Sequence, residues 1–163
     1  MICCIHAKAA NKLERKPKRG EVEYGNWLMS KLRNEKKNNP EVEIVVSSEA
    51  LGETLIKLKE KYDEQDLMEC MKALLDVFNE LKPEYMPPKE EVDRIAVEIS
   101  SRDKMLKFSD CQIAAYALAD MNSVALVTTD KYLIESEELK NLEKELREEG
   151  RRTRKLEATD YWE

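Results

Sequence analysis

The sequence is poor in the residues that several common kinds of site require. Its 163 residues include one histidine and four glycines. A single histidine and the absence of a G-x-S-x-G segment argue against serine-based catalysis. The absence of a glycine-rich phosphate loop argues against a nucleotide-binding α/β protein. The four cysteines (Cys3, Cys4, Cys70 and Cys111) contain no C-x-x-C pair, so we interpret them as reduced, packed thiols rather than zinc ligands.

Long apolar runs are also missing. No segment approaches the length of a membrane span, and the N-terminus has no basic-then-apolar signal pattern. Hydrophobic residues make up 42% of the chain and charged residues 38%, which is typical of a soluble globular protein with a highly charged surface. No repeat or domain boundary is visible. We therefore expect one cytoplasmic domain over residues 1–163, ending in a loose tail.

The net charge of −6 speaks mildly against indiscriminate binding to nucleic acid. Three basic clusters qualify this expectation, although ordinary surface charge is the better interpretation of any single one. An acidic catalytic site would itself lower the net charge, so the sign does not exclude a nuclease. The clusters are Lys16, Lys18 and Arg19; Lys31, Arg33, Lys36 and Lys37; and Arg151, Arg152, Arg154 and Lys155.

The most informative helix is predicted to start at Ser109. Ser109 and Gln112 have the spacing of a capping box, which predicts Ser109 as the N-cap. Asp110 is then predicted to be the first helical residue, where the helix dipole and the free backbone N–H groups favour an ionised carboxylate. The helix is apolar on nearly all sides, which indicates a central, buried position.

A buried strand is predicted to follow this helix. Val124–Val127 is a short, continuous apolar run of the kind found in strands that are covered on both faces. Thr128 and Thr129 end the run, and Asp130 follows at its carboxyl end. In open α/β sheets, ligands bind at that edge.

Helices and short strands alternate along the rest of the chain. This order predicts a mostly parallel sheet with helices on both faces, a three-layer α/β/α sandwich. Pro83 limits the third predicted strand to a sheet edge. Strands are expected at residues 2–5, 42–46, 81–86 and 151–157. Helices are expected at residues 21–33, 48–61 and 89–103, the last of them packed through Val92, Ile95, Ala96 and Ile99. A further helix is expected after a cap at Asp63, with a core stripe of Leu67, Met68, Met71, Leu74, Leu75 and Phe78 at helical spacing. The last helix is expected from a cap at Ser136 to Gly150.

Three segments resemble the PIN domain, a family of metal-dependent nucleases that includes many toxin-like ribonucleases. They are SDCQIAA at 109–115, LVTTD at 126–130 and VVSSEALGETL at 45–55. The resemblance covers most of the chain in order and spacing. It implies a PIN-like fold and a ribonuclease that hydrolyses RNA phosphodiesters. It also implies RNA and a protein antitoxin as partners, together with a homodimer.

The resemblance also implies the site residues. Glu53, Asp110 and Asp130 would be the catalytic, metal-binding acids, and Mg²⁺ or Mn²⁺ would be the ion that neutralises them. Glu53 lies off the apolar stripe of its helix, so periodicity alone would make it a surface acid. Thr128 or Thr129 could orient a carboxylate or a water, or could simply end the strand.

His6 departs from the family pattern. The family has an aspartate at the end of its first strand, followed by a small residue and an asparagine, where this chain has His6-Ala7-Lys8. Replacing the aspartate by an imidazole removes one negative charge and one hard oxygen ligand. Mg²⁺ binding should therefore weaken, and the site should prefer softer ions such as Mn²⁺ or Zn²⁺ more strongly. Two interpretations stay open: a three-carboxylate nuclease with reduced activity, in which His6 is a weaker ligand candidate, and an inactive PIN-like module that binds RNA or a protein partner.

The substitution His6→Asp separates these two interpretations. It restores the missing carboxylate, so RNA cleavage should increase with Mg²⁺ and change less with Mn²⁺. Cleavage of a labelled RNA with each ion measures this. A folded variant that shows no gain with either ion would contradict a vestigial metal site.

Overall fold

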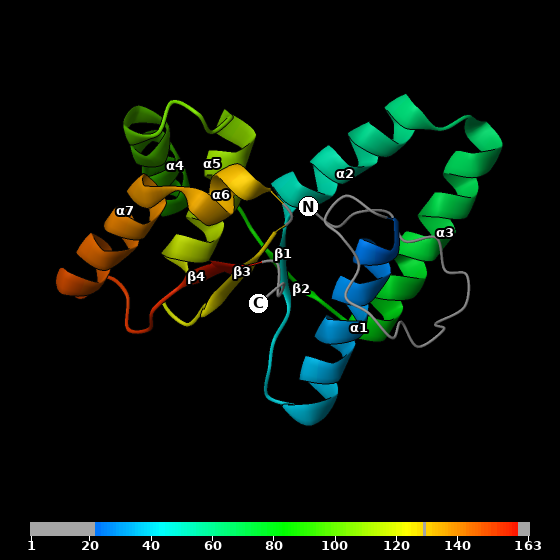
Figure 1. The fold of residues 1–163 in the computed structure, drawn as a ribbon, viewed down its shortest axis with the longest axis horizontal. Coiled ribbons are helices and arrows are strands. Elements are labelled where there is room, and N and C mark those ends of the chain that lie inside the picture. The colour runs from blue at the N-terminus through cyan, green and yellow to red at the C-terminus, as the bar shows by residue number, and fades with distance from the viewer. Residues whose placement is uncertain (1–21, 129, 160–163) are drawn as a thin grey trace. The chain divides into compact units, whose positions relative to one another are not determined.

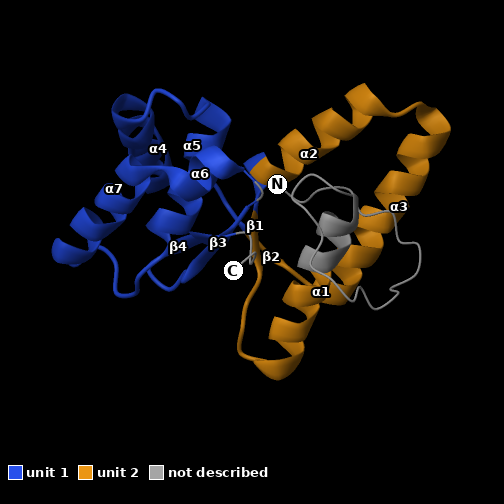
Figure 2. Cartoon of the chain, viewed as in Figure 1, with its two compact units in different colours: residues 1, 47–49, 86–163 blue, residues 2–46, 50–85 orange. Residues whose placement is uncertain are grey.

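The computed structural model describes residues 22–128 and 130–159 (Figure 1). Within these residues the chain is mixed α/β, with helices joined to short strands that pair into two two-stranded sheets. The contacts divide the chain into two compact units (Figure 2). In the described part, unit 1 comprises residues 47–49 and 86–159 and unit 2 comprises residues 22–46 and 50–85. The predicted strand at 2–5, His6 and the C-terminal tail lie outside the described residues.

Unit 2 is built mainly from three helices. Met29, Val77 and Leu81 form a buried cluster against which Leu32, Ile44 and Phe78 pack. β1 pairs with β2, and both strands continue into unit 1 at their last residue. The elements are α1 (Val22–Asn38), β1 (Val45–Ser47), α2 (Ser48–Lys61), α3 (Glu64–Leu81) and β2 (Glu84–Met86).

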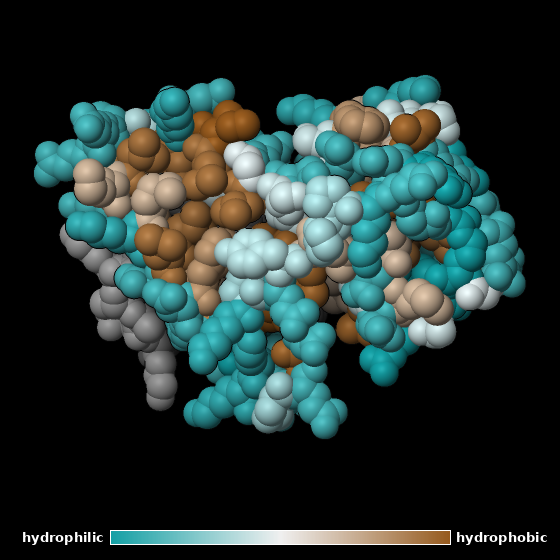
Figure 3. Space-filling view, turned by 180° about the vertical axis from the view of Figure 1, so that it is seen from behind, coloured by the Kyte–Doolittle hydropathy of each residue, from teal (hydrophilic) through white to brown (hydrophobic). Residues whose placement is uncertain are grey.

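The cap predicted for α3 is confirmed, but its predicted core stripe is partly wrong. Asp63 Oδ1 accepts hydrogen bonds from the backbone N–H groups of Gln65 and Asp66, at 3.1 and 3.0 Å. Met68 and Leu75, expected in the core, are 55% and 56% exposed. The buried row is Cys70, Leu74, Val77 and Leu81. Two apolar rows of helical spacing run side by side on α3, and only one of them faces the core. Apolar side chains on part of unit 2 are visible toward the left of Figure 3.

Unit 1 contains the predicted buried helix and the strand that follows it. α5 is largely buried, but within β3 only Leu126 is buried and Val124, just before it, is 53% exposed, so the prediction of a strand covered on both faces is wrong. β3 pairs with β4 in parallel, with Leu126 opposite Ala158. The core row of α4 is as predicted, with Val92, Ile95, Ala96 and Ile99 all buried. The elements are α4 (Glu90–Arg102), α5 (Phe108–Ala119), β3 (Ala125–Val127), α6 (Lys131–Glu135), α7 (Glu137–Glu148) and β4 (Glu157–Thr159).

The start of α5 differs from the prediction. The helix begins at Phe108, and its N-cap is Lys107, whose extended backbone makes no side-chain capping bond. The predictions of Ser109 as the N-cap and of Asp110 as the first helical residue are therefore wrong, although Asp110 does lie in the first turn. The predicted strands are also shorter or shifted, because backbone pairing begins only at Val45, Glu84 and Glu157. The short helix α6 was not predicted.

One end of unit 1 is organised by two arginines, and we call it the arginine end. Arg152 is 3% exposed and follows α7. Its Nη1 donates to the carbonyl oxygens of Ala117, Leu118 and Asp120 at 2.7, 2.7 and 2.8 Å, and its Nη2 donates to that of Ser123 at 2.6 Å. A buried cation thus satisfies the carbonyl groups that α5 leaves unpaired at its C-terminus. Burial lowers the pKa of Arg152, while Glu143 and Asp120 oppose that shift.

Arg151 joins two further elements at the same end. Its guanidinium pairs with Glu91, in the first turn of α4, and with Glu149 after α7. The start of α4, the end of α5 and the end of α7 therefore meet at the arginine end. The opposite ends of these three helices lie at the other end of the unit.

The other end is joined by a second hydrogen-bonded link. Ser136 Oγ accepts the backbone N–H of Leu139 at 3.1 Å, which confirms Ser136 as the cap of α7. The same hydroxyl donates to Asp103 Oδ2 at 2.6 Å. Asp103 Oδ1 accepts the backbone N–H of Met105 at 2.9 Å. The loop between α4 and α5 is therefore bound to the start of α7.

No helix in residues 22–128 or 130–159 is both long and apolar enough to cross a membrane.

Replacing Arg152 by Met should lower the free energy of unfolding by about 3–5 kcal/mol, because buried carbonyl groups lose their donors. Urea unfolding followed by circular dichroism measures the change. Arg154→Met is the matched control, since Arg154 is exposed, and it should change stability by less than about 0.5 kcal/mol. Equal losses in the two variants would contradict the role given to Arg152.

Candidate functional site

Asp110 is placed in the first turn of α5 and is 8% exposed. The next residue, Cys111, is fully buried and is a free thiol. Burial raises the pKa of the Cys111 thiol, and the negative charges of Asp110 and Asp103 raise it further. α5 starts a few residues after Asp103, so Asp110 lies at the end of unit 1 that contains the Asp103–Ser136 link.

Asp130 is placed just beyond β3, as the N-cap of α6. Its Oδ1 accepts the backbone N–H of Tyr132 at 2.8 Å. Its own backbone N–H donates to Thr128 Oγ1 at 3.1 Å. Thr128 is only 2% exposed, and its backbone N–H donates to the carbonyl oxygen of Thr159 beside β4, at 2.9 Å. Thr128 thus connects the sheet to the turn that presents Asp130.

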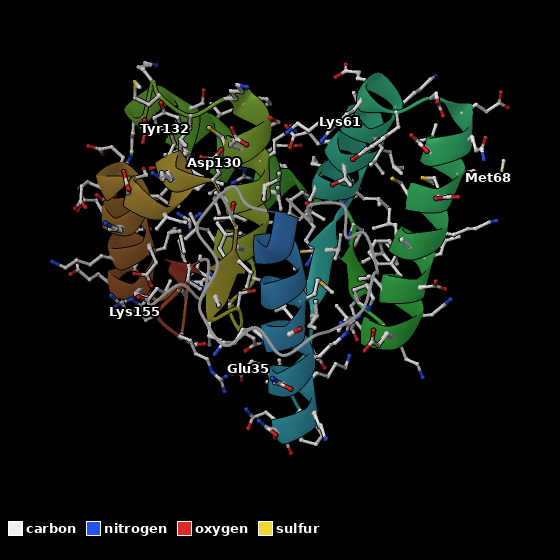
Figure 4. The ribbon with its side chains drawn as sticks, turned by 45° about the vertical axis from the view of Figure 1, so that its right-hand side comes forward. Glu35, Lys61, Met68, Asp130, Tyr132 and Lys155 are labelled. Atoms are coloured by element: carbon white, nitrogen blue, oxygen red, sulfur yellow. The ribbon has the colours of Figure 1, made fainter. Side chains whose placement is uncertain are left out.

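Asp110 and Asp130 lie at the same end of unit 1. β3 starts next to Ser123, which is bound at the arginine end, and runs away from it. α6, which Asp130 caps, has five residues and so advances by about 7.5 Å before it reaches Ser136. Ser136 is bonded to Asp103. We call this end of unit 1 the acid end. Figure 4 shows Asp130 and Tyr132 at one end of the unit and Lys155 at the other.

The remaining predicted site residues are Glu53, His6 and Thr129. Glu53 belongs to α2 in unit 2, where its side chain is 21% exposed and its Oε2 lies 3.4 Å from Lys57 Nζ. Sequence periodicity made Glu53 a surface acid, whereas the structure half-buries it. His6 and Thr129 lie outside the described residues.

The donors at the acid end suit a hard divalent ion with water ligands. Asp110 and Asp130 both offer carboxylate oxygens, and Mg²⁺ is commonly held by one or two carboxylates together with waters and substrate phosphates. Among the residues the structure describes, no three histidine, cysteine, aspartate or glutamate side chains gather closely enough to form a complete protein cage. An ion held by these two residues would therefore need water or phosphate oxygens to complete its ligand set.

Much of the charge in two of the basic clusters is used inside the protein. Arg33 Nε pairs with Glu80 at 2.7 Å, and Lys36 Nζ donates to the carbonyl oxygen of Leu81. Arg151 and Arg152 hold the arginine end. The third cluster lies outside the described residues. For Arg33, Lys36, Arg151 and Arg152, internal pairing is thus a better description than an RNA-binding surface.

The sequence analysis did not predict a buried, hydrogen-bonded polar group in the middle of α5. Tyr116 is 4% exposed, and its hydroxyl makes side-chain hydrogen bonds with Ser48 and Glu49. Burial raises the pKa of Tyr116, and the bond to Glu49 adds to that increase. These bonds tie the start of α2 into unit 1. The only sequence signal was a tyrosine within an otherwise small, apolar helix.

Two exposed aromatic side chains at the acid end were also missed. Phe108, at the start of α5, is 50% exposed, and Tyr132, in α6, is 58% exposed. Each directly follows an exposed lysine, Lys107 or Lys131. The signal in the sequence was this repeated lysine–aromatic pair within three residues of each aspartate.

Searches against protein-family models, curated proteins and solved structures found no match to this chain.

Thr128→Val should remove the acceptor for the Asp130 amide without changing side-chain shape. We expect a loss of about 1–3 kcal/mol in the free energy of unfolding and faster hydrogen exchange at the Asp130 amide. NMR-detected exchange measures the second effect. Thr128→Ser keeps the hydroxyl and should preserve the slow exchange. If the Asp130 amide exchanges at the same rate in Thr128→Val and Thr128→Ser, the Thr128 hydroxyl does not hold the turn.

Proposed function

We propose that this chain is a PIN-like, divalent-metal-dependent ribonuclease that hydrolyses RNA phosphodiesters. The observation that carries the proposal is the common position of Asp110 and Asp130 at the acid end of unit 1. Two segments that resemble the family's acidic motifs thus bring their acids to one end of one unit. The proposal assigns Asp110, Asp130 and Glu53 as the catalytic acids and Mg²⁺ or Mn²⁺ as the ion.

In this proposal Asp110 and Asp130 hold the divalent ion and fix its position. Asp110 offers a carboxylate from the first turn of α5, where backbone N–H groups and the helix dipole favour its ionised form. Asp130 uses Oδ1 to cap α6, so the proposal assigns its Oδ2 to the ion. Thr128 fixes the turn on which Asp130 lies. When bound, the ion would activate a water and neutralise the phosphodiester. Water attacks phosphorus, one P–O bond breaks, and no covalent bond to the protein forms.

The proposal includes the finer features that the resemblance implies. These are the three-layer α/β/α sandwich, a homodimer, and a protein antitoxin if the chain acts as a toxin. The parallel pairing of β3 and β4 and the α5–β3–α6 order in unit 1 support the sandwich. The homodimer and the antitoxin rest on the family resemblance alone.

A second candidate function is an inactive PIN-like module that binds RNA or a protein partner. The residue that favours it is His6, which stands where the family has an aspartate. The two candidates differ in their response to divalent ions. A metal site should raise the thermal unfolding midpoint on addition of Mn²⁺ or Mg²⁺, whereas a module without a site should not respond.

Asp110→Asn is the sharpest test because it keeps shape and removes the charge. Metal-dependent RNA cleavage should fall by at least about 100-fold, since changes around metal ligands alone cost about 10- to 100-fold. The increase in thermal midpoint with Mn²⁺ should also disappear. Gel-resolved cleavage and a thermal melt measure these two effects.

Glu137→Gln is the matched control, because Glu137 is an exposed acid that pairs with Lys140 at 2.6 Å. It should cleave RNA and respond to Mn²⁺ like the wild type. Wild-type cleavage by Asp110→Asn would overturn the assignment of Asp110. An absence of metal-dependent cleavage by the wild type would favour the inactive module.

A further inference from the structure

The acid end carries a surface that neither the fold nor the proposed hydrolysis uses. Lys107-Phe108 lies just before Asp110, and Lys131-Tyr132 lies just after Asp130. Phe108 and Tyr132 expose 50% and 58% of their surface, and both lysines are exposed. Each candidate catalytic aspartate therefore has a cation and an accessible aromatic ring within three residues.

The hydrogen bonds of unit 1 bring the two lysine–aromatic pairs to the same end. The backbone N–H of Tyr132 is bonded to Asp130 in the first turn of α6, at 2.8 Å. The end of that short helix is held through Ser136 to Asp103, at 2.6 Å. Asp103 is also bonded to the backbone of Met105, in the loop that leads into Lys107 and Phe108. Met105 is itself 68% exposed, so it extends the apolar surface of this loop.

The chemistry of this surface matches a nucleic acid strand with unpaired bases. Aromatic faces stack on bases of any sequence, and nearby lysines neutralise the phosphates between them. Lysine is depleted at protein–protein interfaces, so a lysine beside each ring favours nucleic acid over a protein occupant. A paired duplex keeps its bases stacked on one another and leaves them less available to the rings.

We propose that Phe108 and Tyr132 stack on unpaired bases of a single-stranded RNA, while Lys107 and Lys131 contact its phosphates. The inference rests on the proposed function, because it assigns how the substrate strand lies across the acid end. Phe108 and Tyr132 are positioning residues: they hold the strand beside Asp110 and Asp130, and they set a preference for unpaired over paired RNA.

The aromatic residues are tested by binding, measured apart from cleavage. The full chain is titrated into a fluorescently labelled, short single-stranded RNA in EDTA, and the affinity is read from fluorescence anisotropy. Phe108→Ala and Tyr132→Ala should each weaken binding at least about fivefold, and Tyr132→Phe, which keeps the ring, should bind like the wild type. A duplex of the same sequence should bind more weakly than the single strand, and the alanine variants should affect it less.

Tyr85→Ala is the matched aromatic control. Tyr85 is 57% exposed, and its ring packs edge-on against Phe78 in unit 2, with ring centroids 6.1 Å apart. It should leave RNA affinity unchanged. Circular dichroism of each variant checks the fold, which half-exposed residues should not disturb. An equal loss in Tyr85→Ala and Tyr132→Ala would overturn the assignment of Tyr132.

The lysines are tested by the salt dependence of the same binding. Lys107→Gln and Lys131→Gln should each reduce the slope of log affinity against log salt by about 0.7 for one lost phosphate contact. Lys144→Gln is the control, since Lys144 is exposed and lies toward the arginine end of α7. Unchanged slopes in both site variants would overturn the phosphate contacts.

The outcomes separate this inference from the proposed function. Wild-type affinity in Phe108→Ala and Tyr132→Ala overturns the stacking assignment, even if Asp110→Asn abolishes cleavage. Lost affinity in the aromatic variants supports it, even if the wild type cleaves nothing with Mg²⁺ or Mn²⁺. If the aromatic variants lose self-association in sedimentation but keep their RNA affinity, the surface is an interface between two copies and the inference is wrong.

Discussion

The arrangement of unit 1 depends on the buried guanidinium of Arg152. A helix end leaves carbonyl groups without partners, and burying such groups unpaired is costly. Arg152 donates to carbonyl oxygens at the end of α5 and at the start of the segment that leads into β3. It therefore fixes the direction in which the strand leaves the helix. Glu143, which is 5% exposed and bonded to Arg147 and to the backbone of Leu156, holds the neighbouring turn toward β4.

Fixing the arginine end also determines which residues lie at the opposite end of the unit. α5 ends at the arginine end and β3 starts there. The first turn of α5 and the last residue of β3 therefore both lie at the acid end. That is where Asp110 and Asp130 lie, at the end where Asp103 is bonded to Ser136 and to the backbone of Met105. Arg151 and Arg152 thus lie at one end of the unit, and the candidate acids lie at the other.

Local signals in the sequence predicted local structure well. Asp63 and Ser136 cap their helices as expected, because a cap needs only a short side chain and the next few backbone N–H groups. The core row of α4 was predicted correctly because its helix has a single apolar stripe. On α3 two apolar rows compete, and sequence periodicity could not tell that Met68 and Leu75 would face outward.

Features that need distant partners were not predictable. Arg152 sits in a run of basic residues and was interpreted as part of a surface cluster, because its acceptors lie 29 to 35 residues earlier in the chain. Tyr116 depends on Ser48 and Glu49 in the same way. For the candidate site, the prediction that Asp130 would follow a strand is confirmed, whereas Asp110 lies two residues after the first residue of its helix instead of at that residue. The roles of Glu53 and His6 come from the family resemblance and remain predictions.

The central claim is that the acid end of unit 1 binds a divalent ion through Asp110. Electron paramagnetic resonance of Mn²⁺ titrated into the full chain tests it most directly, because the free-ion signal falls as Mn²⁺ is bound. We predict saturable loss of that signal in the wild type and none in the same range for Asp110→Asn, with Glu137→Gln unchanged. An identical titration curve for wild type and Asp110→Asn would contradict the claim.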